Sequence, residues 1–345
     1  MKVAIVLAAV AAVLVLGKTA SAVTLDHVRD RGFVLCGVSG GLPGFSEQDE
    51  HGNWSGIDVD ICRAIAAAMF GEPGKVKYIP LSAAERFEAL ERGEIDVLSR
   101  NTTRTLSRDA SGLEFGAVTF YDGQAFMVHK DLGVESVDAL DGAAICVTKG
   151  TTSETHLDDY FNANGMTYSP KKYRPYEKVI DAYTAGVCDV MTADQSALHA
   201  HRTTLEDPDA HIILPTVISR EPLGPVVCQS RCEDAYDDRW IAVIRWTLYA
   251  MLEAEARGVS SSNVDQMRKT SKDRGVQRLL GGVGQLGGNL HLPNDWAYNV
   301  IKMVGNYAEV YDRNLGPDTP LNIPRGLNGL WMDGGDGIQY PMPFL

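Results

Sequence analysis

The chain has 345 residues, a formal net charge of −13 and a hydrophobic content of 45%. That length is enough for two lobes of ordinary domain size, and the hydrophobic content is typical of a globular protein. The strong negative charge argues against nucleic acid or an anionic membrane surface as a partner.

Residues 1–22 have the pattern of a secretory signal peptide. Lys2 supplies a positive start, residues 4–16 are an apolar run too short for a confident membrane span, and residues 20–22 read Ala-Ser-Ala, a small-residue cleavage site. No later stretch approaches the roughly 18 apolar residues of a membrane helix. We therefore expect an exported, soluble protein that does not insert into the membrane.

The six cysteines of an exported chain predict disulfide bonds, although their spacing alone leaves the pairing open. No Cys-x-x-Cys is present, which disfavours zinc ribbons and thioredoxin-like redox sites. Cys228 and Cys232 stand in a loop-like stretch and predict a local bridge. His199 and His201 are expected on a solvated helix face. We expect no metal and no other cofactor.

The first third of the mature chain alternates helices and strands, which predicts a parallel α/β sheet. Ser82, Glu85 and Gly93 supply a capping box and a glycine stop for one of the helices. The expected helices are residues 24–32, 58–71 and 82–93, and the expected strands are residues 33–38, 75–81 and 94–99.

Two parts of this pattern recur later in the chain. Residues 89–101 match residues 182–194, and residues 31–41 match residues 141–151. The match is weak and could reflect two ordinary strand entries. We nevertheless predict two α/β lobes, each opening with a strand and a glycine turn.

The connections between the lobes are expected at two places. Residues 118–131 are a β-rich run suited to a crossover strand, and a second crossing is expected near residues 217–227, where prolines interrupt regular structure. The predicted division is residues 23–126 plus 223–345 for lobe 1 and residues 127–222 for lobe 2.

The C-terminal part is expected to extend lobe 1. Residues 239–258 and 295–316 each predict an amphipathic helix. The remaining segment is rich in proline and glycine but too aromatic and apolar for simple disorder, so we expect it to dock on the folded chain.

The stretch CGVSGGLPGFS, residues 36–46, allows three interpretations. Ser39 could be a nucleophile, but no histidine stands in a setting that suggests a catalytic triad. A dinucleotide loop needs a different glycine spacing. Ligands of open α/β sheets bind beyond the carboxyl ends of strands. We therefore expect Ser39, Leu42 and Phe45 to line a crevice for a small solute, with a plain tight turn as the alternative.

Residues 99–109, SRNTTRTLSRD, follow a predicted strand and carry groups suited to a carboxylate. Arg108 can hold a carboxylate through two parallel hydrogen bonds. Asn101 and Thr103 add an amide, a hydroxyl and backbone N–H groups. Arg108 could instead form an ordinary surface ion pair.

The second lobe offers complementary groups at its own strand ends. Thr151 and Thr152 begin a predicted helix whose first N–H groups are free to bind an anion. Asp194 could accept hydrogen bonds from an ammonium group. Each could simply cap a helix. Taken together, the two sets fit the zwitterionic head group of an α-amino acid.

At these residues the chain resembles the cluster-2-type periplasmic solute-binding proteins of polar amino acid ABC importers, bacterial extracellular solute-binding protein family 3, and most closely the general L-amino acid-binding branch. The resemblance covers nearly the whole mature chain. Its motifs include CGVSGGLPGFS, RFEALERGEIDVLSRNTTRTLSRD, GTTSETHLDDYF, ISREPLGP and RGLNGLW. It implies a type II fold with two lobes, each a mostly parallel sheet flanked by helices, joined by a two-strand hinge.

The resemblance also implies roles for individual residues. Arg108 corresponds to the carboxylate-binding arginine of the family, Thr103 to its ligand-contacting threonine and Asp194 to its ammonium-binding aspartate. Asn101 stands where the backbone touches the head group, and the Gly-Thr turn falls on residues 150–152. The loop that reads the ligand side chain falls on residues 39–45. Narrow-specificity relatives often carry an acidic residue at Ser39 and an aromatic one at Leu42, so a neutral, adaptable pocket for many amino acids is expected here.

The family further implies the disulfide pairs Cys36–Cys62 and Cys146–Cys188, each within one lobe. It implies an L-amino acid ligand, an inner-membrane ABC permease as partner, a periplasmic location and a monomeric, non-enzymatic protein. Two alternatives remain open. One is an exported dehydratase or peptidoglycan-cleaving enzyme on the same fold, for which Asp122 and Glu154 are conceivable acids. The other is a sensory binding protein.

Overall fold

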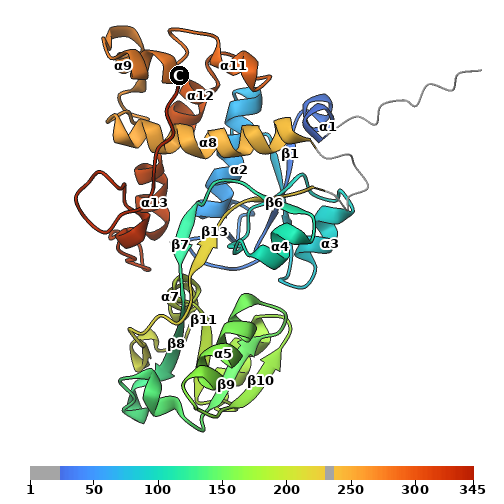
Figure 1. Ribbon diagram of the computed structural model, residues 1–345, viewed down its shortest axis with the longest axis vertical. Coiled ribbons are helices and arrows are strands. Elements are labelled where there is room, and N and C mark those ends of the chain that lie inside the picture. Colours follow the sequence, from blue (N-terminus) through green and yellow to red (C-terminus); the bar gives the residue numbers. More distant parts are fainter. Residues whose placement is uncertain (1–23, 230–236) are drawn as a thin grey trace, which may run out of the picture.

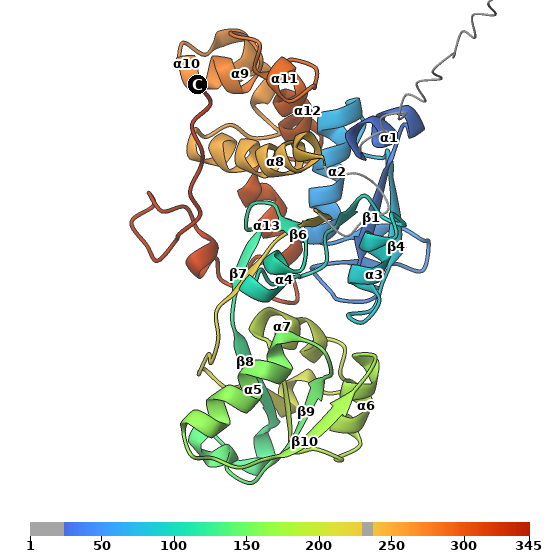
Figure 2. The ribbon, with the colours of Figure 1, turned by 45° about the vertical axis from the view of Figure 1, so that its right-hand side comes forward.

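The computed structural model describes residues 24–229 and 237–345, and these form two α/β lobes joined by a narrow waist (Figures 1 and 2). The sheet of lobe 1 contains β1 (Val34–Val38), β4 (Val76–Pro80), β5 (Val97–Leu98), β6 (Leu113–Phe115) and β14 (Val226–Cys228). The sheet of lobe 2 contains β8 (Gln124–His129), β9 (Ala144–Thr148), β10 (Ser169–Tyr173), β11 (Val190–Asp194) and β12 (His211–Ile213).

The two sheets have the same layout, which agrees with the predicted repeat. Their strand orders are β4-β1-β5-β14-β6 and β10-β9-β11-β8-β12, each with parallel pairs on one side and antiparallel pairs on the other. The matched aspartates have the same role. The Leu35 N–H donates to Asp96 Oδ2 at 2.6 Å, and the Ala144 N–H donates to Asp189 Oδ2 at 2.9 Å. Asp96 thus fixes β1 beside β5, and Asp189 fixes β9 beside β11.

The hinge consists of β7 (Phe120–Asp122) and β13 (Glu221–Leu223), which pair antiparallel between the lobes (Figure 1). The crossover strand expected over residues 118–131 is instead two strands, β7 and β8, with Gly123 between them. The proposed lobe boundaries, after residues 126 and 222, fall inside β8 and β13.

The helices cover the faces of the sheets. The helix α2 (Ile57–Phe70) ends as predicted at Gly71, which adopts a left-handed conformation with φ 66°. Ser82 and Glu85 form the expected reciprocal hydrogen bonds, but they close a turn, and α3 (Arg86–Glu91) begins only after it. The other helices are α1 (Thr24–Arg31), α4 (Leu106–Ala110), α5 (Thr152–Ala163), α6 (Glu177–Thr184), α7 (Gln195–Arg202), α8 (Asp238–Ala256), α9 (Val264–Thr270), α10 (Arg274–Leu279), α11 (Leu286–Asn289), α12 (Trp296–Met303) and α13 (Tyr307–Leu315).

The single helix predicted over residues 295–316 is wrong, because the structure has two helices there. Gly305 has φ 107°, a conformation that side chains disfavour, and it ends the run after α12. Asn306 then caps α13 and forms a capping box with Glu309.

The C-terminal tail docks on lobe 1, as predicted. The Phe344 ring is 5% exposed and packs against Trp246 and Trp296. The side chain of Asn328, in the 3₁₀ turn Gly326–Asn328, bonds both backbone groups of Tyr121 in β7 at 2.7 and 3.1 Å. The tail therefore holds one strand of the hinge.

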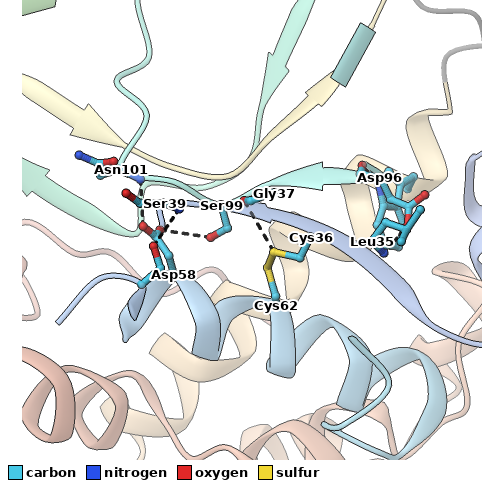
Figure 3. The surroundings of a disulfide bond; sticks show 11 residues. Leu35, Cys36, Gly37, Ser39, Asp58, Cys62, Asp96, Ser99 and Asn101 are labelled. Atoms are coloured by element: carbon cyan, nitrogen blue, oxygen red, sulfur yellow. Dashed lines mark hydrogen bonds between the residues drawn. A yellow bond between two sulfur atoms is a disulfide. The ribbon is translucent and has the colours of Figure 1, made fainter. Parts of the chain in front are cut away.

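Both disulfides expected from the family are present, and each lies within one lobe. Cys36–Cys62 joins β1 to α2 (Figure 3), and Cys146–Cys188 joins β9 to the segment that leads into β11.

Cys232 lies outside the described residues, so its bridge to Cys228 stays a prediction. Residues 1–22, the predicted signal peptide, also lie outside them. Among the helices that the structure describes, none is long and apolar enough to cross a bilayer.

Candidate ligand-binding cleft

A cavity of about 660 Å³ lies between the lobes, beyond the carboxyl ends of β1 and β5 on one wall and of β9 and β11 on the other. This is where an open α/β sheet binds its ligand. Seven of the predicted site residues line it: Ser39, Leu42, Asn101, Thr103, Thr151, Thr152 and Asp194.

The loop after β1 is a compact, internally bonded turn. The Ser39 N–H donates to Ser46 Oγ at 2.9 Å, and the Leu42 N–H donates to the Ser46 carbonyl at 2.9 Å. Phe45 does not line the cavity. Its ring is 1% exposed and packs edge-on against Phe120 at 5.5 Å between centroids, so it supports the loop from the core.

Asn101 is held at the cavity edge by a buried carboxylate (Figure 3). Asp58 in α2 accepts hydrogen bonds from the Asn101 N–H at 2.9 Å and from Ser99 Oγ at 3.2 Å. Asn101 has φ 30°, an uncommon value for a residue with a side chain. Burial raises the pKa of Asp58 to about 6, against the effect of these hydrogen bonds. Asp58 thus fixes the turn that presents Asn101.

Arg108 lies behind the cavity wall and does not line it. Its Nη1 donates to the Thr103 carbonyl at 2.6 Å, and its guanidinium lies 5.2 Å from the centre of the Phe87 ring. Burial lowers the pKa of Arg108, while the charges of Glu221 and Asp194 raise it. The guanidinium is therefore within electrostatic reach of the opposite wall.

Two further arginines line the same wall, and the sequence interpretation missed both. Arg86, the first residue of α3, is 3% exposed and has its guanidinium carbon 4.7 Å from the centre of the Phe87 ring. Arg100 donates from Nε to the Leu81 carbonyl at 2.8 Å. Arg86 lies in the stretch predicted as a helix, and Arg100 lies in the stretch predicted as a polar loop after a strand. No sequence signal distinguishes a buried arginine from an exposed one at the start of a helix.

On the opposite wall Asp194 joins β11 to α7 and makes no capping hydrogen bond with its side chain. Its pKa is raised well above the usual value, first by burial and then by the charges of Asp122 and Glu221, while Arg86 and Arg108 oppose the shift. A buried carboxylate with raised pKa is stabilised by an incoming cation.

The hinge adds two acidic residues beside this wall. Glu221 Oε2 accepts a hydrogen bond from Thr152 Oγ1 at 3.2 Å, and Asp122 accepts hydrogen bonds from the Ser196 hydroxyl and the Gly123 N–H. Thr152 is the first residue of α5, so this contact ties the pocket to a hinge strand.

His201 is buried, not solvated as predicted, and it lines the cavity. Its ring is 6% exposed and stacks on Tyr176 at 4.0 Å between centroids, because it lies on the inner face of α7. Burial lowers the pKa of His201 to about 3, which keeps the imidazole neutral. In residues 24–229 and 237–345, no group of three or more metal-ligating side chains could hold a metal ion.

A cavity between two hinged α/β lobes, with a cationic wall facing a carboxylate, defines a two-lobed solute-binding protein. Residues 34–274 match the family described as bacterial extracellular solute-binding proteins, family 3, and the chain belongs to that family. Its members are solute-binding proteins. Glu154, considered above as a candidate acid, accepts the Gly150 N–H at 2.6 Å, pairs with Lys172 at 3.1 Å and lies outside the cavity lining.

Among similar proteins, the general L-amino acid-binding periplasmic protein AapJ of Rhizobium johnstonii is 53% identical over 96% of both chains. The glutamate/glutamine/aspartate/asparagine-binding protein BztA of Rhodobacter capsulatus is 45% identical over 94% of both chains. A solved periplasmic binding protein from Brucella ovis with glutathione bound is 48% identical, with a TM-score of 0.90 over 94% of this chain and 100% of the other.

Proposed function

We propose that this protein is the periplasmic binding component of an amino acid ABC importer. It captures a broad range of free L-amino acids in the cleft and delivers them to an inner-membrane permease. The observation that carries this proposal is the separation of charge across the cavity, with Arg86 and Arg100 on one wall and Asp194 on the other. A zwitterion is the ligand that such a pair of walls complements. The names of the relatives, AapJ and BztA, point to the same class of ligand.

In this proposal the α-carboxylate binds Arg108 and Thr103, and the ammonium binds Asp194. Arg108 must turn from the Thr103 carbonyl to do so. Thr151 and Thr152 add N–H groups from the start of α5, which favours an anion. Each lobe supplies half of the contacts, so a ligand stabilises the closed form to the extent that it binds that form better. Closure also removes water and strengthens both ion pairs.

A thermal-shift screen across the twenty amino acids tests this function. A ligand at about 100 times its dissociation constant adds about 2.7 kcal/mol to the free energy of unfolding. For a chain of this size that unfolds as one unit, this is a rise in Tm of roughly 4 °C. N-acetylated amino acids are the control, because they lack the ammonium that Asp194 would bind. The proposal fails if no free amino acid raises Tm, or if the acetylated forms raise it equally.

A second candidate ligand is a γ-glutamyl peptide, because the Brucella ovis protein carries glutathione. The γ-linked glutamate of glutathione keeps a free ammonium and α-carboxylate, so it presents the same head group as an amino acid. Adding reduced glutathione to the screen, beside free glutamate, tests this candidate directly.

A further inference from the structure

We propose that the C-terminal extension acts as a clamp on the hinge. The clamp consists of Tyr307, Asn328 and Gln339. It confines the rotation between the lobes to one peptide link in each hinge strand and thereby strengthens ligand binding. The effect on affinity rests on the proposed function, whereas the restriction of the hinge does not. All three residues lie beyond residues 34–274, the part of the chain that matches the family, so the shared part of the fold does not contain the clamp.

Asn328 of the clamp binds the free edge of β7. The strands β7 and β13 form a two-stranded sheet, so the other edge of β7 has no strand partner among the described residues (Figure 1). The side-chain amide of Asn328 occupies this edge as the peptide group of a neighbouring strand would. It accepts a hydrogen bond from the Tyr121 N–H at 2.7 Å and donates one to the Tyr121 carbonyl at 3.1 Å.

Two further hydrogen bonds from the clamp fix the residues that lead into β7. The Tyr307 hydroxyl donates to the Thr119 carbonyl at 2.7 Å, and Gln339 Nε2 donates to the Val118 carbonyl at 3.1 Å. Tyr307 and Gln339 are buried side chains, so these bonds lie inside the folded extension and not on its surface. The segment before the pivot is therefore held at three successive points.

Arg325 ties the clamp to the helices of lobe 1. Its guanidinium donates to the Asn328 carbonyl at 3.0 and 3.2 Å and pairs with Glu255 of α8 at 2.9 Å. The same guanidinium lies 5.1 Å from the centre of the Tyr307 ring and 5.0 Å from that of Tyr311, both in α13. The clamp is thus supported by two helices of lobe 1, which allows it to hold β7 in place.

The second hinge strand, β13, is fixed to the same lobe by residues 102–104. The Arg104 N–H donates to the Pro222 carbonyl at 2.9 Å, and the Gly224 N–H donates to the Thr102 carbonyl at 3.1 Å. Pro222 is the register partner of Tyr121. Both hinge strands are therefore held to lobe 1 as far as this pair.

The next pair of the hinge, Asp122 and Glu221, is held by lobe 2. Asp122 accepts a hydrogen bond from the Ser196 hydroxyl in the first turn of α7. Glu221 accepts the Thr152 hydroxyl at 3.2 Å and lies 2.9 Å from His156 Nδ1, both residues of α5. Adjacent residue pairs of the hinge thus belong to different lobes.

Rotation between the lobes is consequently left to two peptide links, Tyr121–Asp122 and Glu221–Pro222. Proline fixes its own φ and restricts the residue before it, which narrows the second link further. A hinge with little freedom in the empty protein loses little conformational entropy when a ligand holds it closed. Without the clamp the freedom would extend back along β7, and the ligand would have to order more of the chain.

Isothermal titration calorimetry with glutamine tests the effect on affinity. Asn328→Ala removes both hydrogen bonds to β7, and Asn328 does not line the cavity. Freezing the backbone of one residue corresponds to about 5- to 30-fold in an equilibrium constant, so partial release should weaken binding by about 3- to 10-fold. Tyr307→Phe removes only the hydroxyl and should cause a smaller loss in the same direction.

Phe344→Ala is the matched control within the same tail. Phe344 is also buried, but it packs against Trp246 of α8 and Trp296 of α12 and not against the hinge. This variant should lower the thermal stability of the protein and leave its affinity for glutamine unchanged.

Pulsed electron paramagnetic resonance measures the freedom of the hinge directly. Arg92 of lobe 1 and Lys178 of α6 in lobe 2 are exposed. Among the described residues no cysteine is free, so spin labels can be attached selectively to Arg92→Cys and Lys178→Cys. In the ligand-free protein Asn328→Ala should broaden the distribution of distances between the labels, and Phe344→Ala should not.

Weaker binding together with broader distances in Asn328→Ala, but not in Phe344→Ala, supports the proposal. Unchanged affinity, weaker binding without broader distances, or the same changes in Phe344→Ala would overturn it. Circular dichroism shows whether the variants fold, and Tyr307→Phe provides the same comparison if Asn328→Ala does not. If the unaltered protein bound no amino acid, the proposed function would fail, while the distances in the ligand-free protein would still decide whether the clamp restricts the hinge.

Discussion

Asp194 is buried at a position where a negative charge on its carboxyl group is energetically unfavourable. The residue is 8% exposed, its pKa is raised well above the usual value, and Asp122 and Glu221 contribute to that shift after burial. The pKa of Asp122 itself is raised by burial to about 6. The raised pKa favours the protonated form of Asp194, whereas a bound ammonium favours its carboxylate.

The affinity for glutamine should consequently fall as the pH falls through the raised pKa of Asp194, by up to about tenfold per pH unit below it. The sign follows from linkage, because binding of the ammonium releases a proton from Asp194. Calorimetry at a series of pH values measures the effect. Asp194→Asn should bind weakly at every pH without this dependence, and an unaltered pH profile in that variant would contradict the assignment.

Asp122→Asn is the informative control for the same measurement. It removes one of the negative charges that raise the pKa of Asp194. In this variant the affinity should therefore decrease at a lower pH than in the unaltered protein, and the magnitude of the decrease should be the same. Glu221 and the guanidinium groups of Arg86 and Arg108 face the same carboxylate and are unchanged in this control.

At the scale of elements, each lobe is held by a disulfide that joins β1 or β9, the corresponding strands of the two sheets, to a later element. Cys36–Cys62 closes a span of 26 residues and Cys146–Cys188 a span of 42 residues. In lobe 2 the bridge lies next to β11, the strand that ends at Asp194. It therefore supports the wall that carries the ammonium-binding candidate.

Replacing both Cys146 and Cys188 by alanine should lower the free energy of unfolding by roughly 3–4 kcal/mol, because the unfolded chain gains freedom over the longer span. Urea unfolding followed by circular dichroism measures this change. The same replacement at Cys36 and Cys62 is the matched comparison and should cost slightly less. A change below about 1 kcal/mol for the longer span would contradict the expectation.

At the scale of the whole molecule, the hinge strands connect the pocket to the C-terminal extension. Glu221 of β13 accepts the Thr152 hydroxyl at the cavity, while Asn328 of the tail bonds the backbone of Tyr121 in β7. The Tyr307 hydroxyl also donates to the Thr119 carbonyl, just before β7, at 2.7 Å. The extension thus anchors the lobe 1 side of the hinge.

Saturating ligand should close the cleft and reduce the radius of gyration measured by small-angle X-ray scattering. Arg108→Ala should cost about 2–4 kcal/mol in binding and show no reduction at the same ligand concentration, because the α-carboxylate loses its charged partner. Arg104→Ala is the control, since Arg104 is exposed and pairs with Asp109. The expected closure of the cleft would be contradicted if the radius of gyration of the unaltered protein did not change. That comparison uses a ligand whose binding has been demonstrated by calorimetry.

The fold was largely predictable from the sequence, because periodicity, caps and glycine stops are local. Gly71 ends α2 where expected, and the repeat of residues 89–101 at 182–194 anticipates two equivalent sheets. Local signals also misled, since the continuous amphipathic pattern of residues 295–316 concealed the break at Gly305.

The sequence by itself determined which strand ends carry the polar groups, and so placed Asn101, Thr103 and Asp194 on one cavity. Only the tertiary structure decided which charged side chains are buried there. Arg86, Arg100 and His201 belong to ordinary helix and loop patterns, and their burial depends on how the elements and lobes pack. Since burial sets the energetic cost of a charge, the chemistry of the cleft follows from contacts between residues far apart in the chain.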